Sequence, residues 1–266
     1  MSQSAGTKED VVQNTVTEIK WLAIVAVYVA LASVSVASAR ADLTAPNIIE
    51  HCRQAYKALK SYHGTTRVLT KHSSGGVDGS YSTMATVQFV RPGKIRVDGT
   101  LMSSGRFAFV SDGSHTWETS IGNVEKWESA ESTEMAIAAF TGVSQSAATT
   151  IPAILVQATW GNPFLAIGAP KVTNETINGR PAHRIDGKSP TGQVTMWIDQ
   201  KTFLLVKIHQ RHDFSHMKTP PFPNAQNRRS EGTELGVMDV TETYTDVRLN
   251  ESIADSVFTR PNADPH

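Results

Sequence analysis

Much of the chain alternates between apolar and polar residues with the two-residue period of a β-strand. Three successive stretches place their apolar residues on every second position: Ala85, Val87 and Phe89; Ile95 and Val97; and Phe107 and Phe109. Successive side chains of a strand point to opposite faces, so one face of these strands should be buried. Turn signals such as Asp112-Gly113 and Asn178-Gly179 separate the stretches. The pattern predicts antiparallel strands over residues 64–126 and 171–249, with an inserted loop over 214–236.

Helical spacing appears before and between these strand regions. The first helix has one apolar face, formed by Ile48, Cys52, Ala55, Tyr56 and Leu59. Thr44 is a candidate N-cap and Pro46 falls in the first turn, which predicts a helix over about residues 44–61. Residues 131–140 are also helix-like, and residues 144–165 form a broken, apolar connection. We expect residues 131–165 either to form a lid over the sheet or to be ordinary core helices.

The N-terminus has the pattern of an export signal. An apolar run over residues 21–36 is followed by Ala37-Ser38-Ala39 and Ala39-Arg40-Ala41, which are candidate signal-peptidase sites. The run is shorter than the roughly 20 residues that span a bilayer. We therefore expect residues 1–39 to be a signal peptide and residues 40–266 to form a single periplasmic domain. Acidic residues in the leader keep an uncleaved membrane anchor as the alternative.

Composition excludes several functions. The chain has 25 basic and 25 acidic residues and lacks a basic block, so we expect no nucleic-acid partner. Cys52 is the single cysteine, which excludes an intramolecular disulfide, and its helical spacing predicts a buried side chain.

The motifs of common enzymes are absent from the sequence. It has no Gly-x-Ser-x-Gly elbow and no glycine-rich phosphate loop, and Cys52 has no base placed beside it. Asp112 and Asp199 both fall in turns, where an aspartate usually caps its own backbone. We therefore expect neither catalysis nor a cofactor.

A cluster of histidines is the one candidate metal site. It consists of His209, His212, Asp213 and His216. On a regular strand His209 and His212 point to opposite faces and cannot bind one ion together. We expect a solvated strand end and no metal.

Three blocks of the chain resemble the LolA-like superfamily of periplasmic lipoprotein carriers. They are Arg91-Pro92-Gly93 between two strands, Trp197-Ile198-Asp199 before an apolar strand, and Phe258-Thr259-Arg260-Pro261 near the C-terminus. The resemblance implies a mainly β fold, a half-open antiparallel β-barrel with an N-terminal helix and short lid helices. It further implies that the barrel holds an acyl chain without covalent chemistry, and that Arg91 joins the barrel rim to the lid.

The expected ligand-binding residues are mostly aromatic. They are Phe89, Arg91, Ile95, Phe107, Phe109, Trp117 and Phe164. In a closed barrel the same residues would be plain core, and the sequence leaves that alternative open. We expect a monomer that binds a lipid or lipoprotein acyl chain and makes transient contact with a membrane or membrane protein. A sensor of the same fold, which binds a lipid or partner protein without transport, is the alternative.

Overall fold

The computed structural model describes most of the chain after the predicted signal. It covers residues 43–261, except 75, 101–104, 121–122, 145–148, 160, 166, 190–191 and 216–235. The predicted signal peptide or anchor lies outside the described residues, as does most of the predicted loop over 214–236. Among the helices that the structure does describe, none is long and apolar enough to span a bilayer.

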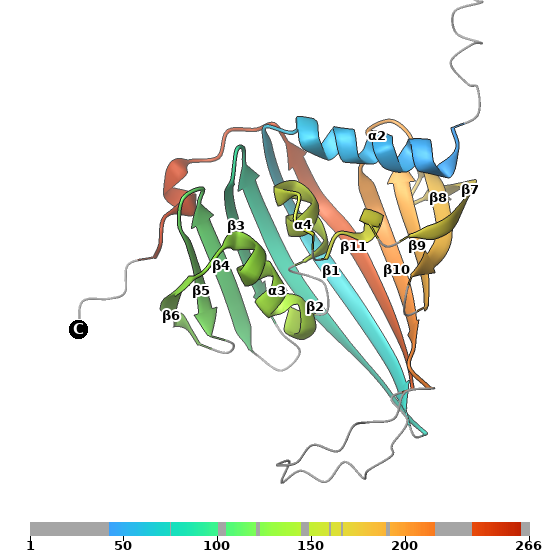
Figure 1. The fold of residues 1–266 in the computed structure, drawn as a ribbon, viewed down its shortest axis with the longest axis horizontal. Helices are drawn as coiled ribbons and strands as arrows, with labels where there is room; N and C mark the ends of the chain where they lie inside the picture. Colours follow the sequence, from blue (N-terminus) through green and yellow to red (C-terminus); the bar gives the residue numbers. More distant parts are fainter. Residues whose placement is uncertain are drawn as a thin grey trace, which may run out of the picture. The chain divides into compact units, whose positions relative to one another are not determined.

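Eleven strands form one antiparallel sheet in the order β6-β5-β4-β3-β2-β1-β11-β10-β9-β8-β7 (Figure 1). The strands are β1 (Ser61–Ser74), β2 (Val77–Val90), β3 (Lys94–Thr100), β4 (Arg106–Asp112), β5 (Thr116–Ser120), β6 (Asn123–Ala130), β7 (Gly168–Ile177), β8 (Arg180–Ser189), β9 (Gly192–Asp199), β10 (Leu205–Asp213) and β11 (Val237–Leu249). β6 and β7 end the sheet and do not pair with each other, so the sheet is not closed. The predicted half-open antiparallel β architecture is confirmed.

Helices cover one end and one face of this sheet. The helix α2 (Ala45–Ala58) lies along one end of the strands, and α3 (Thr133–Ser144) and α4 (Thr150–Val156) lie over a face that we call the inner face (Figure 1). The single turns η2 (Pro163–Leu165) and η3 (Asp255–Phe258) are 3-10 helices. We refer to α3 and α4 together as the cover helices.

The two faces of the sheet belong to different hydrophobic clusters. Phe107 and Phe109 on β4 point to the inner face and join the main core, to which α2 and the cover helices also contribute. Ala108 and Val110, between and after them on the same strand, join a second cluster that includes Phe258 of η3. The alternation in the sequence thus correctly placed Phe107 and Phe109 on one face of the sheet, although the residues on both faces of β4 are buried.

Polar side chains at the turns have the roles that the sequence predicts. Asn178 and Gly179 have φ values of 50° and 77°, as a tight β7–β8 hairpin requires. Asp112 accepts hydrogen bonds from the backbone N–H groups of Ser114 and His115. Asp199 does the same for Lys201 and Thr202.

The first helix is shorter than predicted. It ends at Ala58 because Ser61 already begins β1. Thr44 occupies the N-cap position, but its side chain makes no capping hydrogen bond. Cys52 is fully buried as predicted, and burial raises the pKa of its thiol.

Candidate ligand-binding site

Strands β2, β3 and β4 build an aromatic layer on the inner face. Phe89 lies opposite Ile95 in the register of β2 and β3, and Phe109 lies opposite Val97 in that of β3 and β4. Phe107 lies opposite Gly99, where any side chain would overlap the phenylalanine ring. Cross-strand neighbours on one face are in direct contact, so the alternation of these strands is sufficient to assemble the layer.

The cover helices fill the space in front of this layer. Phe140 of α3 stacks on Phe107 and Phe109, with ring centroids 5.1 Å and 6.1 Å apart. The apolar side of α4 enters the same core through Ile151 and Leu155. In this structure the cover helices therefore occupy the space that an acyl chain would need.

Four of the predicted ligand-binding residues lie together in this layer. Phe89, Ile95, Phe107 and Phe109 are each at most 1% exposed and belong to one cluster. Their burial fits both a covered ligand site and a plain core, so their role in binding stays a prediction.

Trp117 lies on the other face from the one that the prediction of a ligand-binding role requires. It pairs with Val110 across β4 and β5 and packs with the second cluster, on the opposite side of the sheet from Phe109. Its face depends on the register from β4 into β5, which an aromatic composition does not reveal. Trp117 cannot line a cavity on the inner face.

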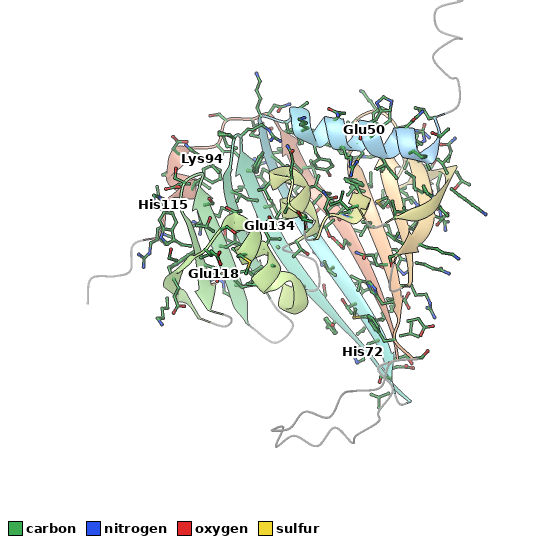
Figure 2. All side chains as sticks on the ribbon, in the orientation of Figure 1. Glu50, His72, Lys94, His115, Glu118 and Glu134 are labelled. Atoms are coloured by element: carbon green, nitrogen blue, oxygen red, sulfur yellow. The ribbon has the colours of Figure 1, made fainter. Side chains whose placement is uncertain are left out.

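Phe164 lies at a cleft between α2 and the segment from the end of α4 to η2. The cleft has a volume of about 310 Å³. Its α2 side is polar and its opposite side is mixed, as its lining residues show: Glu50, Arg53, Gln54 and Lys57 on α2, and Ile154, Gln157, Ala158, Thr159, Asn162, Phe164 and Leu165 opposite. Figure 2 shows Glu50 on α2. A cleft with both polar and apolar lining residues suits the end of an amphipathic molecule.

Arg91 binds the end of α2. Its Nε donates to the Leu59 carbonyl at 2.8 Å, and its Nη2 donates to the Tyr56 carbonyl at 3.0 Å. The Tyr56 carbonyl lies in the last turn of α2 and accepts one further bond, of 3.3 Å, from the Leu59 N–H, so Arg91 adds to the hydrogen bonds that complete the C-terminal end of the helix. Arg91 therefore joins the sheet rim to a covering helix, but that helix is α2 and not the segment 131–165, where we expected the lid.

Replacing Arg91 with lysine should be nearly as harmful as replacing it with alanine. The planar guanidinium holds two carbonyls at once, whereas an ammonium offers a single point charge. We expect each variant to lose about 2 kcal/mol of unfolding free energy in a denaturant titration. Arg67→Ala, which removes an exposed arginine from β1, is the control and should change little. Full stability of Arg91→Lys would show that only the charge matters.

A buried carboxylate on the inner face was not found from the sequence. Glu242 of β11 is fully buried, and its Oε1 accepts a 2.9 Å hydrogen bond from the Thr150 hydroxyl of α4. Its Oε2 accepts a 2.9 Å hydrogen bond from the Tyr244 hydroxyl. The Gln210 amide donates a longer bond of 3.5 Å to Oε1. Burial raises the pKa of the Glu242 carboxyl to about 7, because the three donors only partly replace the lost water.

One signal in the sequence could have revealed this residue. Val240, Glu242 and Tyr244 share one face of β11 by simple alternation, and the two neighbours are buried in the core. A carboxylate in the middle of an inward-facing row needs hydrogen-bond partners. The partner on α4 could not be foreseen, because it is 92 residues away in the chain.

The candidate metal cluster does not assemble within the described residues. His209 and His212 lie three residues apart in a regular part of β10, which places them on opposite faces. His209 bonds to Asp239 across the strands, whereas His212 stacks on Phe214. His216 lies outside the described residues.

No family model matches the sequence, and no curated protein matches it. Solved structures do overlap with it. A LolA superfamily protein of Nitrosomonas europaea overlaps with a TM-score of 0.34 and 13% identity, over 82% of this chain and 99% of that chain. The lipoprotein LppX of Mycobacterium tuberculosis overlaps with a TM-score of 0.40 and 15% identity, over 79% of this chain and 98% of that chain.

MucB from the MucA/MucB complex of Pseudomonas aeruginosa also overlaps, with a TM-score of 0.38 and 12% identity, over 81% of this chain and 60% of that chain. A member of the LolA superfamily, which the sequence motifs resemble, is thus among the solved structures to which this chain is similar. Overlaps this distant establish no shared ligand, partner or activity.

Proposed function

We propose that this protein is an exported, non-enzymatic binding protein that holds a lipid or acyl chain on the inner face of its open sheet. The observation that carries the proposal is that the aromatic layer is covered by two short helices and not by further strands. A helix that packs on the layer can be exchanged for an apolar ligand, whereas strands of a closed barrel cannot. The ligand would occupy the space in front of Phe107 and Phe109 that Phe140 fills now.

Burial of the acyl chain favours such an exchange. A sixteen-carbon chain gains roughly 13 kcal/mol on leaving water, at about 0.8 kcal/mol per methylene. The cover helices would lose part of their own packing on the sheet. The net affinity is therefore the free energy gained by burying the acyl chain minus the free energy lost by the helices. α3 is linked to the segment after α4 by a 2.8 Å bond from the Thr159 N–H to Glu134, which Figure 2 shows on α3. The cover helices can therefore move together.

Binding without covalent chemistry is consistent with the groups at the site. The aromatic layer has no nucleophile, and the Cys52 thiol is held in its neutral form by burial. The polar cleft beside Phe164 would take the head of the ligand, with Arg53 and Lys57 available for an anionic group. We propose that the head lies in this cleft when it is charged.

Removing the ring of Phe140 should strengthen binding. Phe140→Ala uncovers Phe107 and Phe109, so we expect a fluorescent hydrocarbon probe to bind several-fold more tightly than to the wild type. Met135→Ala is the matched control, because it truncates a 52% exposed side chain on the same helix. Solvent extraction and mass spectrometry of the purified protein would identify a bound lipid. Absence of saturable probe binding in both the wild type and Phe140→Ala would exclude the proposed site.

A partner-binding sensor is the second candidate, favoured by the open edges of the sheet. Within the described part of the chain, β6 and β7 each have only one neighbouring strand. A free edge can accept an extended segment of another protein as an additional strand. A stable partner recovered with a tagged protein that contains no extractable lipid would favour this function.

A further inference from the structure

Glu242 is the one fully buried carboxyl group on the described part of the inner face. Its cross-strand neighbours are Val68 on β1 and Ile208 on β10, both fully buried. A carboxylate in such surroundings is costly unless donors satisfy both oxygens. The fold meets this need with Tyr244 from the same strand, Thr150 from α4 and, at the longer distance of 3.5 Å, Gln210 from β10.

The two closer donors, Tyr244 and Thr150, differ in how firmly they are held. Tyr244 lies on the same strand as Glu242 and stays beside it whatever the cover helices do. Thr150 is the first residue of α4, and its hydroxyl reaches Glu242 only while α4 is packed on the sheet. Displacement of α4 by a ligand would therefore remove one donor from a fully buried carboxyl group.

The start of α4 has the same order of chemical groups as a lipid with a hydroxyl at its polar end. A hydroxyl at Thr150 is followed by a buried apolar segment that includes Ile151, Ile154 and Leu155. A lipid with a neutral hydrogen-bond donor at its polar end presents the same sequence of groups. Because the donor and the apolar body occupy adjoining positions, such a molecule can satisfy Glu242 and cover the core at once.

We propose that Glu242 is the polar anchor of this site and selects lipids whose polar end carries a neutral hydroxyl or amide donor, which replaces the Thr150 hydroxyl. This inference rests on the proposed function and adds the class of ligand to it. A hydrocarbon with no donor would leave Glu242 short of a partner. An anionic head would be repelled by the ionised carboxylate and would have to lie elsewhere, in the cleft beside Phe164.

A matched pair of ligands tests the selection. We would displace the hydrocarbon probe with 1-tetradecanol and with methyl tetradecyl ether, which share an alkyl chain but differ in the donor. At pH 8, where the Glu242 carboxyl is mostly ionised, we expect the wild type to bind the alcohol about tenfold more tightly, as the loss of one hydrogen bond to a charged group implies. Glu242→Met keeps the length of the side chain without an acceptor and should bind the two ligands equally.

Thr150→Val should strengthen ligand binding, whereas Glu242→Met abolishes the preference for the alcohol. A gain in affinity cannot be explained by a folding defect. Thr150→Val removes the hydroxyl that competes with the ligand but leaves Glu242 in place. Both ligands should then bind more tightly, with the alcohol still preferred. Circular dichroism would confirm that each variant is folded.

The outcomes separate the two proposals. Equal affinity of the wild type for alcohol and ether would overturn the anchor role while leaving lipid binding intact. Loss of the preference in Thr150→Val would also overturn it. If neither ligand displaces the probe from the wild type or Thr150→Val, or the probe itself does not bind, lipid binding on this face fails and the anchor role fails with it.

Discussion

Phe109→Ala should cost about 3–5 kcal/mol of unfolding free energy, the typical loss when a buried aromatic ring is removed from a core. Phe109 is fully buried, lies opposite Val97 and stacks on Phe140 with ring centroids 6.1 Å apart. Its removal leaves a cavity between the sheet and α3 that rigid strands cannot close. Denaturant titration followed by circular dichroism measures the loss.

The matched control is Met84→Ala, since Met84 is 41% exposed and its side chain contributes little burial. We expect this control to stay within about 1 kcal/mol of the wild type. Phe109→Leu is a milder change that keeps most of the apolar volume. A loss below about 1 kcal/mol for Phe109→Ala would mean that the ring is not packed as described.

Raising the pH through neutrality should destabilise the protein because of Glu242. Burial holds the pKa of its carboxyl at about 7 in the folded state, above the ordinary value of 4.5. The folded state therefore binds the proton more tightly than the unfolded state. The stabilisation that proton binding adds to the free energy of unfolding falls as the pH rises from about 4.5 to about 7. This pKa shift corresponds to a loss of about 3 kcal/mol of unfolding free energy once the carboxyl is ionised.

Few other titrating groups act near this carboxyl. Burial raises the pKa of the Tyr244, Tyr56 and Tyr62 phenols, so these side chains stay neutral over this range. His212 lies on the same face of β10, and burial lowers the pKa of its imidazole, which favours the neutral form near pH 7. The lowered pKa of His212 acts in the opposite sense, because the folded state then binds fewer protons than the unfolded state, so a substitution is needed to isolate the effect of Glu242.

Glu242→Gln isolates this effect, because the amide has the same shape and cannot ionise. The difference in unfolding free energy between variant and wild type should be small at pH 5 and should reach up to about 3 kcal/mol in favour of the variant at pH 8. Denaturant titrations at both pH values measure it. Parallel pH profiles of the two proteins would contradict a carboxyl with a raised pKa.

The alternation of apolar residues predicted most of the sheet correctly, because the side-chain period of a strand is a local property. The two-residue period places Phe107 and Phe109 on one face of β4. In the structure the antiparallel register sets Gly99 and Val97 opposite them. The hairpin at Asn178-Gly179 was equally local, since its backbone needs residues that tolerate positive φ. The face of Trp117 depends on the register across the turn at residues 112–115, which an aromatic composition does not reveal.

Composition and alternation by themselves determined a mainly β protein with antiparallel strands, helices before and between them, and a buried cysteine, whereas the open sheet was implied by the resemblance to the LolA-like superfamily. Tertiary packing decided that Arg91 caps α2, that Phe140 covers the aromatic layer, and that Thr150 meets Glu242. Each of these contacts joins residues about 30 or more positions apart, and a buried polar or aromatic side chain finds its partner only when the whole sheet has formed. The candidate site is therefore a property of the fold, although the face on which Phe89, Ile95, Phe107 and Phe109 lie follows from the alternation within each of their strands.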